Sequence, residues 1–243
     1  MPAATAVAQG TPAALQSVLA SNVAARGGQA RLDSVRTEEL RGHIVFSDGS
    51  AHPLAVDLVR PGRIRTQITM DQGMIVQAYD GRVAWTISPG TSGTAPAARL
   101  LPEGDAQNVA AGGDMDGALV HSEAKGNRLT LVGIDTADGR PAYVIDVVTK
   151  SGLNDTYYID TVSHLQTKWR GKRVMNGAPV TFVSMFRDYR RVNGVMIAFR
   201  IDSFTEGQAG GQHIVLDSVH VNDAIPDAEF TMPGSSAASE GAP

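Results

Sequence analysis

Apolar and polar residues alternate along most of the chain, in short runs that end at turn-forming residues. Leu40, Ile44 and Phe46 alternate with polar or small neighbours, and Asp48-Gly49 then marks a turn. The same pattern returns up to Ile87, with turn signals at Pro61-Gly62, Asp71-Gln72-Gly73 and Asp80-Gly81. Strict alternation between such turns predicts an antiparallel meander with one apolar and one polar face.

A second alternating series begins near Leu119 and continues to Phe230. Its turn signals are Lys125-Gly126-Asn127, Ala137-Asp138-Gly139, Ser151-Gly152, Asn176-Gly177, Asn193-Gly194 and Gly207 to Gly211. Because no Pro/Ser linker or charge run separates the two series, we expect one continuous curved sheet in a single domain. The intervening residues 89–113, with a weak helical pattern at Glu103–Ala110, are interpreted as a lid or crossover, or as an ordinary surface excursion.

One amphipathic helix is predicted before the first strand. Thr11 suits the N-cap and Pro12 the first helical position, and the stripe contains Leu15, Val18, Leu19 and Val23. Gly27-Gly28 ends the helix, and a short second turn is expected at 29–35.

The two ends of the chain carry no periodic pattern. Ala6-Val7-Ala8 before Gln9 fits the tail of a signal-peptidase site, which leaves a trimmed secretory signal or a plain alanine-rich start as alternatives. We therefore expect disordered segments at 1–10 and 234–243 around a domain at 11–233.

Composition narrows the class of protein. The chain has 21 basic and 25 acidic residues, a net charge of −4, which argues against binding to a phosphate backbone. The absence of cysteine excludes disulfides, thiolate metal sites and cysteine nucleophiles. No apolar run approaches the roughly 18 residues that a membrane-spanning helix needs.

Motifs for catalysis are missing or fit poorly. Ser122-Glu123-Ala124-Lys125 matches S-x-x-K by letters but sits beside a β run without its partner motif, and Asp114-Met115-Asp116 lacks the later ligands of a calcium loop. The six histidines are scattered singly, and His43 and His213 fall on the polar phase of their strands. We predict no catalytic residue, metal ligand or cofactor.

Apolar strand surface is abundant relative to the helices that could cover it. Methionines and the two tryptophans, Trp85 and Trp169, lie on apolar phases, and methionine adapts to variable apolar ligands. Two interpretations remain open, a cavity for an apolar ligand or an ordinary core.

Three stretches resemble the periplasmic lipoprotein carriers of the LolA/LolB-like superfamily. Residues 60–65 (RPGRIR) look like the family's R-P-x-x-(F/I)-R turn, residues 80–85 (DGRVAW) are similar to its D-G-x-x-x-W hairpin, and residues 227–233 (DAEFTMP) look like its closing D-A-x-F-x-x-P. The arginines of the first stretch could also meet an anionic lipid headgroup or a partner chain, or form ordinary ion pairs at a solvated turn.

The resemblance implies a mainly β protein with few helices, a half-open β-barrel whose mouth is covered by helices. It implies a non-catalytic, monomeric periplasmic carrier of lipoprotein acyl chains or other lipid, with an inner-membrane donor complex and an outer-membrane acceptor. The alternative is a sensor or protein-interaction domain on the same fold. The expected ligand-binding side chains are Leu40, Ile44, Phe46, Val56, Leu58, Ile64, Ile68, Met74, Val76, Trp85, Trp169, Phe182, Phe186 and Phe199.

Overall fold

The computed structural model describes residues 11–90, 97–175 and 177–234, and these residues form a single antiparallel sheet with three α-helices on one face. The predicted disordered ends, 1–10 and 234–243, lie outside the described residues except for Gly234. The sheet has 13 strands in the order β6-β5-β4-β3-β2-β1-β13-β12-β11-β10-β9-β8-β7. Because β6 and β7 at its two edges do not pair with each other, the barrel is open, as expected.

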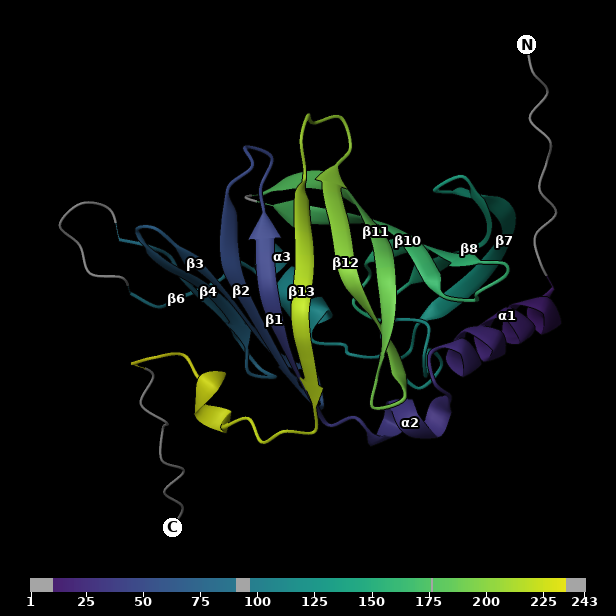
Figure 1. Cartoon of the computed structure of the whole chain (residues 1–243), viewed down its shortest axis with the longest axis horizontal. Helices are drawn as coiled ribbons and strands as arrows, with labels where there is room; N and C mark the ends of the chain where they lie inside the picture. The colour runs from purple at the N-terminus through teal and green to yellow at the C-terminus, as the bar shows by residue number, and fades with distance from the viewer. Residues whose placement is uncertain (1–10, 91–96, 176, 235–243) are drawn as a thin grey trace.

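Most neighbouring strands are joined by hairpins (Figure 1). Their bounds are β1 Thr37–Val45, β2 Ala51–Val59, β3 Arg63–Met70, β4 Gly73–Tyr79, β5 Ala84–Ile87, β6 Arg99–Leu100, β7 Arg128–Ala137, β8 Arg140–Val148, β9 Asn154–Asp160, β10 Gln166–Met175, β11 Ala178–Val192, β12 Val195–Thr205 and β13 Gln212–Val221. The turns predicted from glycine, proline or asparagine coincide with the ends of these strands, except that Asn176 of one of them lies outside the described residues.

The helices are α1 (Pro12–Ala25), α2 (Gln29–Ser34) and α3 (Glu103–Gly112), followed near the end by the 3-10 helix η1 (Asp227–Glu229). The predicted N-cap of α1 is confirmed, since the Thr11 side chain accepts a hydrogen bond from the backbone N–H of Ala14 at 3.3 Å. The weak helical pattern at 103–110 is also confirmed, as α3.

The second strand series is shorter than the sequence predicted. It begins at Arg128 rather than near Leu119, and it ends at Val221 rather than Phe230. Leu119 and Val120 are buried in a turn region and belong to no strand. Their side chains are apolar because they are buried, and the sequence pattern mistook this for a strand. Phe230 follows η1 and is completely buried.

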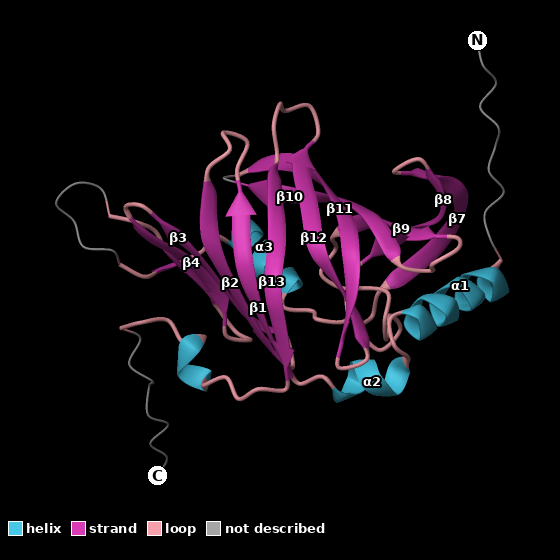
Figure 2. Ribbon diagram, in the orientation of Figure 1, coloured by secondary structure: helices cyan, strands magenta, loops and turns pink. Residues whose placement is uncertain are grey.

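The sheet curves around α3, which appears behind β1 and β13 in Figure 2. At one end of α3, a Cβ placed on Gly104 would lie 3.0 Å from the Cβ of Val174 on β10. At the other end, a Cβ on Gly112 would lie 3.3 Å from Ile64 Cδ1 on β3. Five strands separate β3 from β10 in the sheet, so a ten-residue helix can contact both only if the sheet wraps around it.

The inner face of the sheet holds two apolar clusters. Over β7–β9, Leu15, Val18 and Leu19 of α1 pack with Leu119 against strand residues that include Ile145. Over β12 and β13, Leu32 of α2 belongs to a second cluster that includes Phe199 and Leu216. These clusters fix which face of the sheet is the inside.

Candidate functional site

The register between strands shows which side chains share the inner face. Residues paired across antiparallel strands project to the same side. Ile64, which meets α3, is paired with Leu58, and alternate positions continue this face through Val56 to Leu40. Across the middle of the sheet, Ile44 is paired with Ile214.

Most of the predicted ligand-binding residues do share this inner face. The register places there Leu40, Ile44, Val56, Leu58, Ile64, Ile68, Trp169, Phe182, Phe186 and Phe199. Phe46 lies just beyond β1, with its ring 5.7 Å from that of His52, the residue paired with Ile44. The inner-face residues are not equally accessible, since Ile44, Leu58, Ile64 and Phe199 are buried whereas the others retain part of their surface.

Three predicted residues lie on the opposite, outer face. These are Met74, Val76 and Trp85. Tyr79 is paired with Ile64 and therefore faces inward, so its neighbour Ala78 faces outward. Met74 and Val76 alternate in phase with Ala78 on β4, and Trp85 is paired with Ala78, so all three face outward. The expectation that these three share a surface with Ile64 and Ile68 is therefore wrong.

The physical reason for this error is a second apolar layer on the outer face of β4 and β5. The segment after η1 crosses this face, where Met232 packs against Val76 and Trp85. The indole Nε1–H of Trp85 donates a 2.7 Å hydrogen bond to the carbonyl oxygen of Phe230. Both faces of β4 and β5 are covered, so the apolar residues that alternate along these strands include residues that face outward.

A pocket of about 310 Å³ lies between α3 and the β4–β6 edge of the sheet. Its lining is mainly apolar and consists of Tyr79, Arg82, Val83, Ala84, Leu100, Leu101, Ala106, Gln107 and Ala110. Val83 and Leu100 are among the exposed large apolar side chains. The volume is at the lower end of the roughly 300–1,000 Å³ typical of small-molecule pockets.

The helix that covers this pocket is held lightly. None of the residues of α3 is fully buried, and its N-terminus has no side-chain cap. Two side-chain hydrogen bonds tie it to neighbouring strands and turns, from Gln107 Nε2 to the Ser151 carbonyl at 2.7 Å and from Asn108 Nδ2 to the Val174 carbonyl at 2.8 Å. Few buried apolar contacts are typical of elements with low local stability.

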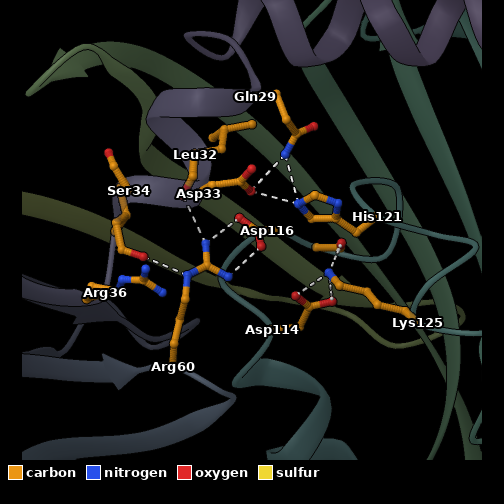
Figure 3. Close-up of polar contacts among 12 residues, drawn as sticks. Gln29, Leu32, Asp33, Ser34, Arg36, Arg60, Asp114, Asp116, His121 and Lys125 are labelled. Atoms are coloured by element: carbon orange, nitrogen blue, oxygen red, sulfur yellow. Dashed lines mark hydrogen bonds and ion pairs between the residues drawn. The ribbon is translucent and has the colours of Figure 1, made fainter.

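The segment that follows α3 is, in contrast, bonded firmly (Figure 3). Arg60 donates two hydrogen bonds to the carboxylate of Asp116, at 2.6 and 2.7 Å, and further bonds to the carbonyls of Leu32 and Val35 at 3.0 and 2.6 Å. Arg26 donates to the Asp116 carbonyl at 2.6 Å. These bonds join α1, α2 and the β2–β3 turn to one point of the segment.

Burial raises the pKa of Asp116, but the hydrogen bonds and positive charge of Arg60 outweigh burial, so this pKa lies below its usual value. Asp114 accepts hydrogen bonds from Lys125 Nζ at 2.6 and 2.7 Å. Both carboxylates of the calcium-like triplet, and the lysine of the S-x-x-K match, therefore take part in ion pairs. This arrangement stabilises the segment and offers no activated nucleophile.

The arginines around Pro61 also form ion pairs. Arg63 lies 2.7 Å from Asp227 and Arg65 lies 3.7 Å from Glu229, both on η1. Of the two interpretations of this turn, the structure supports ion pairing, with the partners supplied by the C-terminal segment.

Glu38 is a titratable group on the inner face that the sequence did not single out. Its cross-strand neighbours are Leu58 and Val221, both buried, and no described residue forms a hydrogen bond or ion pair with its carboxyl. Burial raises the pKa of Glu38 to about 7, although Arg26 and Arg60 oppose the shift.

Among the residues that the structure describes, no group of three or more His, Asp or Glu side chains could hold a metal ion. No described helix is both long and apolar enough to cross a membrane.

The pocket residues on α3 and β6 were not expected from sequence, because their runs are too short to show a period. The alanines at 106 and 110, one helical turn apart, were the available signal.

Comparison with solved structures identifies the fold. The chain matches a LolA superfamily protein from Nitrosomonas europaea with a TM-score of 0.57 and 16% identity, over 89% of this chain and 97% of that one. It matches a domain assigned as an outer membrane lipoprotein-sorting protein, from Vibrio parahaemolyticus, with a TM-score of 0.58 and 10% identity over the same shares. A DUF1329 family protein from Desulfovibrio piger gives a TM-score of 0.58, 10% identity and, again, 89% and 97% coverage.

The sequence matches no family model and no curated protein. At these identities the likeness establishes the fold alone, and that fold is the one that the three sequence stretches suggested.

Proposed function

We propose that this chain, which has the LolA fold, is a non-catalytic periplasmic carrier that binds acyl chains of lipoproteins or lipids on the inner face of its sheet. The observation that carries the proposal is α3, a helix without a fully buried residue that covers a mainly apolar pocket of about 310 Å³. The names of the compared proteins, a LolA superfamily protein and a lipoprotein-sorting domain, agree with this reading.

The energetics favour an acyl chain as the ligand. Each CH₂ group that leaves water contributes roughly 0.8 kcal/mol, so a chain of modest length gains enough to bind without any polar contact. Ile68 does not line the pocket, but it is half-buried and lies on the same face of β3 as Ile64, which meets α3, so displacing α3 would extend the apolar surface toward it. A cover that opens also permits release, which a carrier needs.

The carrier proposal assigns no bond-making step to the protein. The ion pairs around Asp116 hold the segment that follows α3, and no described polar group near the pocket pairs a nucleophile with a base. An inner-membrane donor and an outer-membrane acceptor complete the proposed route. If purified protein contains no lipid but binds a defined periplasmic protein, the sensor alternative replaces the carrier.

The proposal is tested by native mass spectrometry of the purified protein together with titration of a fluorescent fatty acid. The matched variants are Ile68→Asp and Met74→Asp. Both place a carboxylate on neighbouring strands of the same hairpin, but Ile68 faces inward and is half-buried, whereas Met74 faces outward and is 48% exposed.

We expect Ile68→Asp to weaken probe binding at least roughly tenfold, since a charge in an apolar site is costly to desolvate. Met74→Asp should bind as the unmodified protein does. Circular dichroism checks that both variants fold. Equal affinities for the probe in all three proteins, or no binding at all, would contradict the proposed site.

A further inference from the structure

The polar side chains that line the α3 pocket differ in whether they already have a partner. The Tyr79 hydroxyl donates to the Gly81 carbonyl at 2.9 Å, and Gln107 Nε2 donates to the Ser151 carbonyl. The guanidinium of Arg82 forms no hydrogen bond or ion pair with any residue that the structure describes. Arg82 is therefore the lining group left available to a ligand.

The surroundings of Arg82 do not neutralise it. The Asp80 carboxylate, the nearest acid along the chain, accepts hydrogen bonds at 2.8 Å from the backbone N–H groups of Arg82 and Val83. Glu103, in the first turn of α3, forms no ion pair with Arg82. A second exposed arginine without a described side-chain partner, Arg99, lies next to the pocket residue Leu100 on β6.

Elsewhere in the described chain, several arginines near the sheet form ion pairs, although Arg128 on β7 does not. Arg60, Arg63 and Arg173 each meet a carboxylate within 2.7 Å. Arg82 and Arg99 therefore place two cations without a described side-chain partner beside one apolar pocket. Leaving a cation unpaired at the rim of an apolar pocket suits a ligand with an apolar body and a negative end.

We propose that the pocket selects anionic amphiphiles, with the carboxylate or phosphate of the ligand at Arg82 and its acyl chain against Ala84, Ala106 and Ala110. This inference rests on the proposed function and specifies its ligand class. Arg99 adds positive charge at the β6 side of the opening. Charge-assisted hydrogen bonds from a guanidinium to an oxyanion are stronger than neutral ones and add geometric specificity.

The test compares a charged and an uncharged form of one chain. The probes are cis-parinaric acid and its methyl ester, titrated at neutral pH into the full chain and into Arg82→Glu. The control variant is Arg128→Glu, because Arg128 is also exposed and without a described side-chain partner but lies at the far edge of the sheet, on β7.

We expect the acid to bind more tightly than the ester, and Arg82→Glu to weaken binding of the acid by roughly tenfold while leaving the ester within about twofold. Arg128→Glu should leave both affinities unchanged. Equal binding of acid and ester, or equal effects of the two variants, overturns the anionic selectivity but leaves the carrier proposal standing. Failure of both probes to bind overturns the carrier proposal itself.

Competition then separates the two sources of a negative end. Displacement of the bound probe by phosphatidylglycerol but not by phosphatidylcholine assigns the site to a phospholipid, whereas displacement by palmitate alone assigns it to a free fatty acid. If neither phosphatidylglycerol nor palmitate displaces the probe, the inferred ligand class is wrong.

Discussion

Glu38 gives a direct physical test of the inner face. Its carboxyl lies between Leu58 and Val221, without a hydrogen-bond partner among the described residues, and burial raises its pKa from the ordinary value of 4.5 to about 7. One pKa unit corresponds to about 1.4 kcal/mol, so the full shift corresponds to about 3 kcal/mol. Because part of Glu38 stays accessible to water, we expect its ionisation to lower the free energy of unfolding by about 2 kcal/mol.

The sign follows from the raised pKa. Below pH 4.5 the carboxyl is neutral in the folded and unfolded chain, and its contribution to stability is fully present. Between pH 4.5 and 7 it ionises first in the unfolded chain, so the folded protein loses stability as pH rises, and above 7 the loss is complete. Glu38→Gln cannot ionise and avoids this loss.

Urea unfolding of the unmodified protein and of Glu38→Gln, at pH 4, 5.5, 7 and 8, measures the difference. The free energy of unfolding of the variant, relative to that of the unmodified protein, should rise between pH 4.5 and 7 and stay constant above pH 7. Glu39→Gln, on the neighbouring residue whose side chain pairs with Arg41 on the outer face at 2.9 Å, controls for the chemical change itself. An advantage that does not change with pH would refute the burial of Glu38.

Two further substitutions test the contacts that hold the fold. Asp116→Ala leaves the buried end of Arg60 without its carboxylate and should lower the free energy of unfolding by about 3–5 kcal/mol at pH 7. The double variant with Arg60→Met should lose less stability than the sum of the two single variants. Additive losses in urea unfolding would contradict the pairing. In the unmodified protein the stability contributed by this ion pair is present above pH 3.8, and it is lost as the pH falls from 3.8 through the lowered pKa of Asp116. Phe230→Ala removes a completely buried ring and should cost about 3–5 kcal/mol, with a change in Trp85 fluorescence because that indole bonds to the Phe230 carbonyl; a cost under about 1 kcal/mol would show that the ring is not part of the core.

The sequence predicted most strands and turns because hairpins depend on local chemistry. Turns such as Asn193-Gly194 place both residues at positive φ, which asparagine and glycine tolerate better than other residues do, so their positions are visible in the sequence. The helix α1 was predictable for the same reason, since its N-cap and its apolar stripe are local features.

The faces of the strands were less predictable, because alternation reports which side chains are buried and not which layer buries them. For Leu58 and Ile64 the covering layer is α3 and its neighbours, inside the curve. For Val76 and Trp85 it is Phe230 and Met232, which lie about 150 residues later in the chain and cover the outside. Only long-range pairing separates the two cases, and no local pattern contains it.

Two fixed points on either side of α3 limit how its pocket can open. After the helix, a side chain on Gly113 would collide with the carbonyl oxygen of Gly62, and Asp116 is bonded to Arg60, so this end stays with the β2–β3 turn. Before the helix, the backbone N–H of Leu101 donates to the Ala84 carbonyl at 2.9 Å. Displacement is therefore confined to residues 102–112, which hold no fully buried side chain. Opening within these bounds would expose the pocket while the clusters under α1 and α2 stay packed, so that a ligand could exchange at little cost to the stability of the sheet.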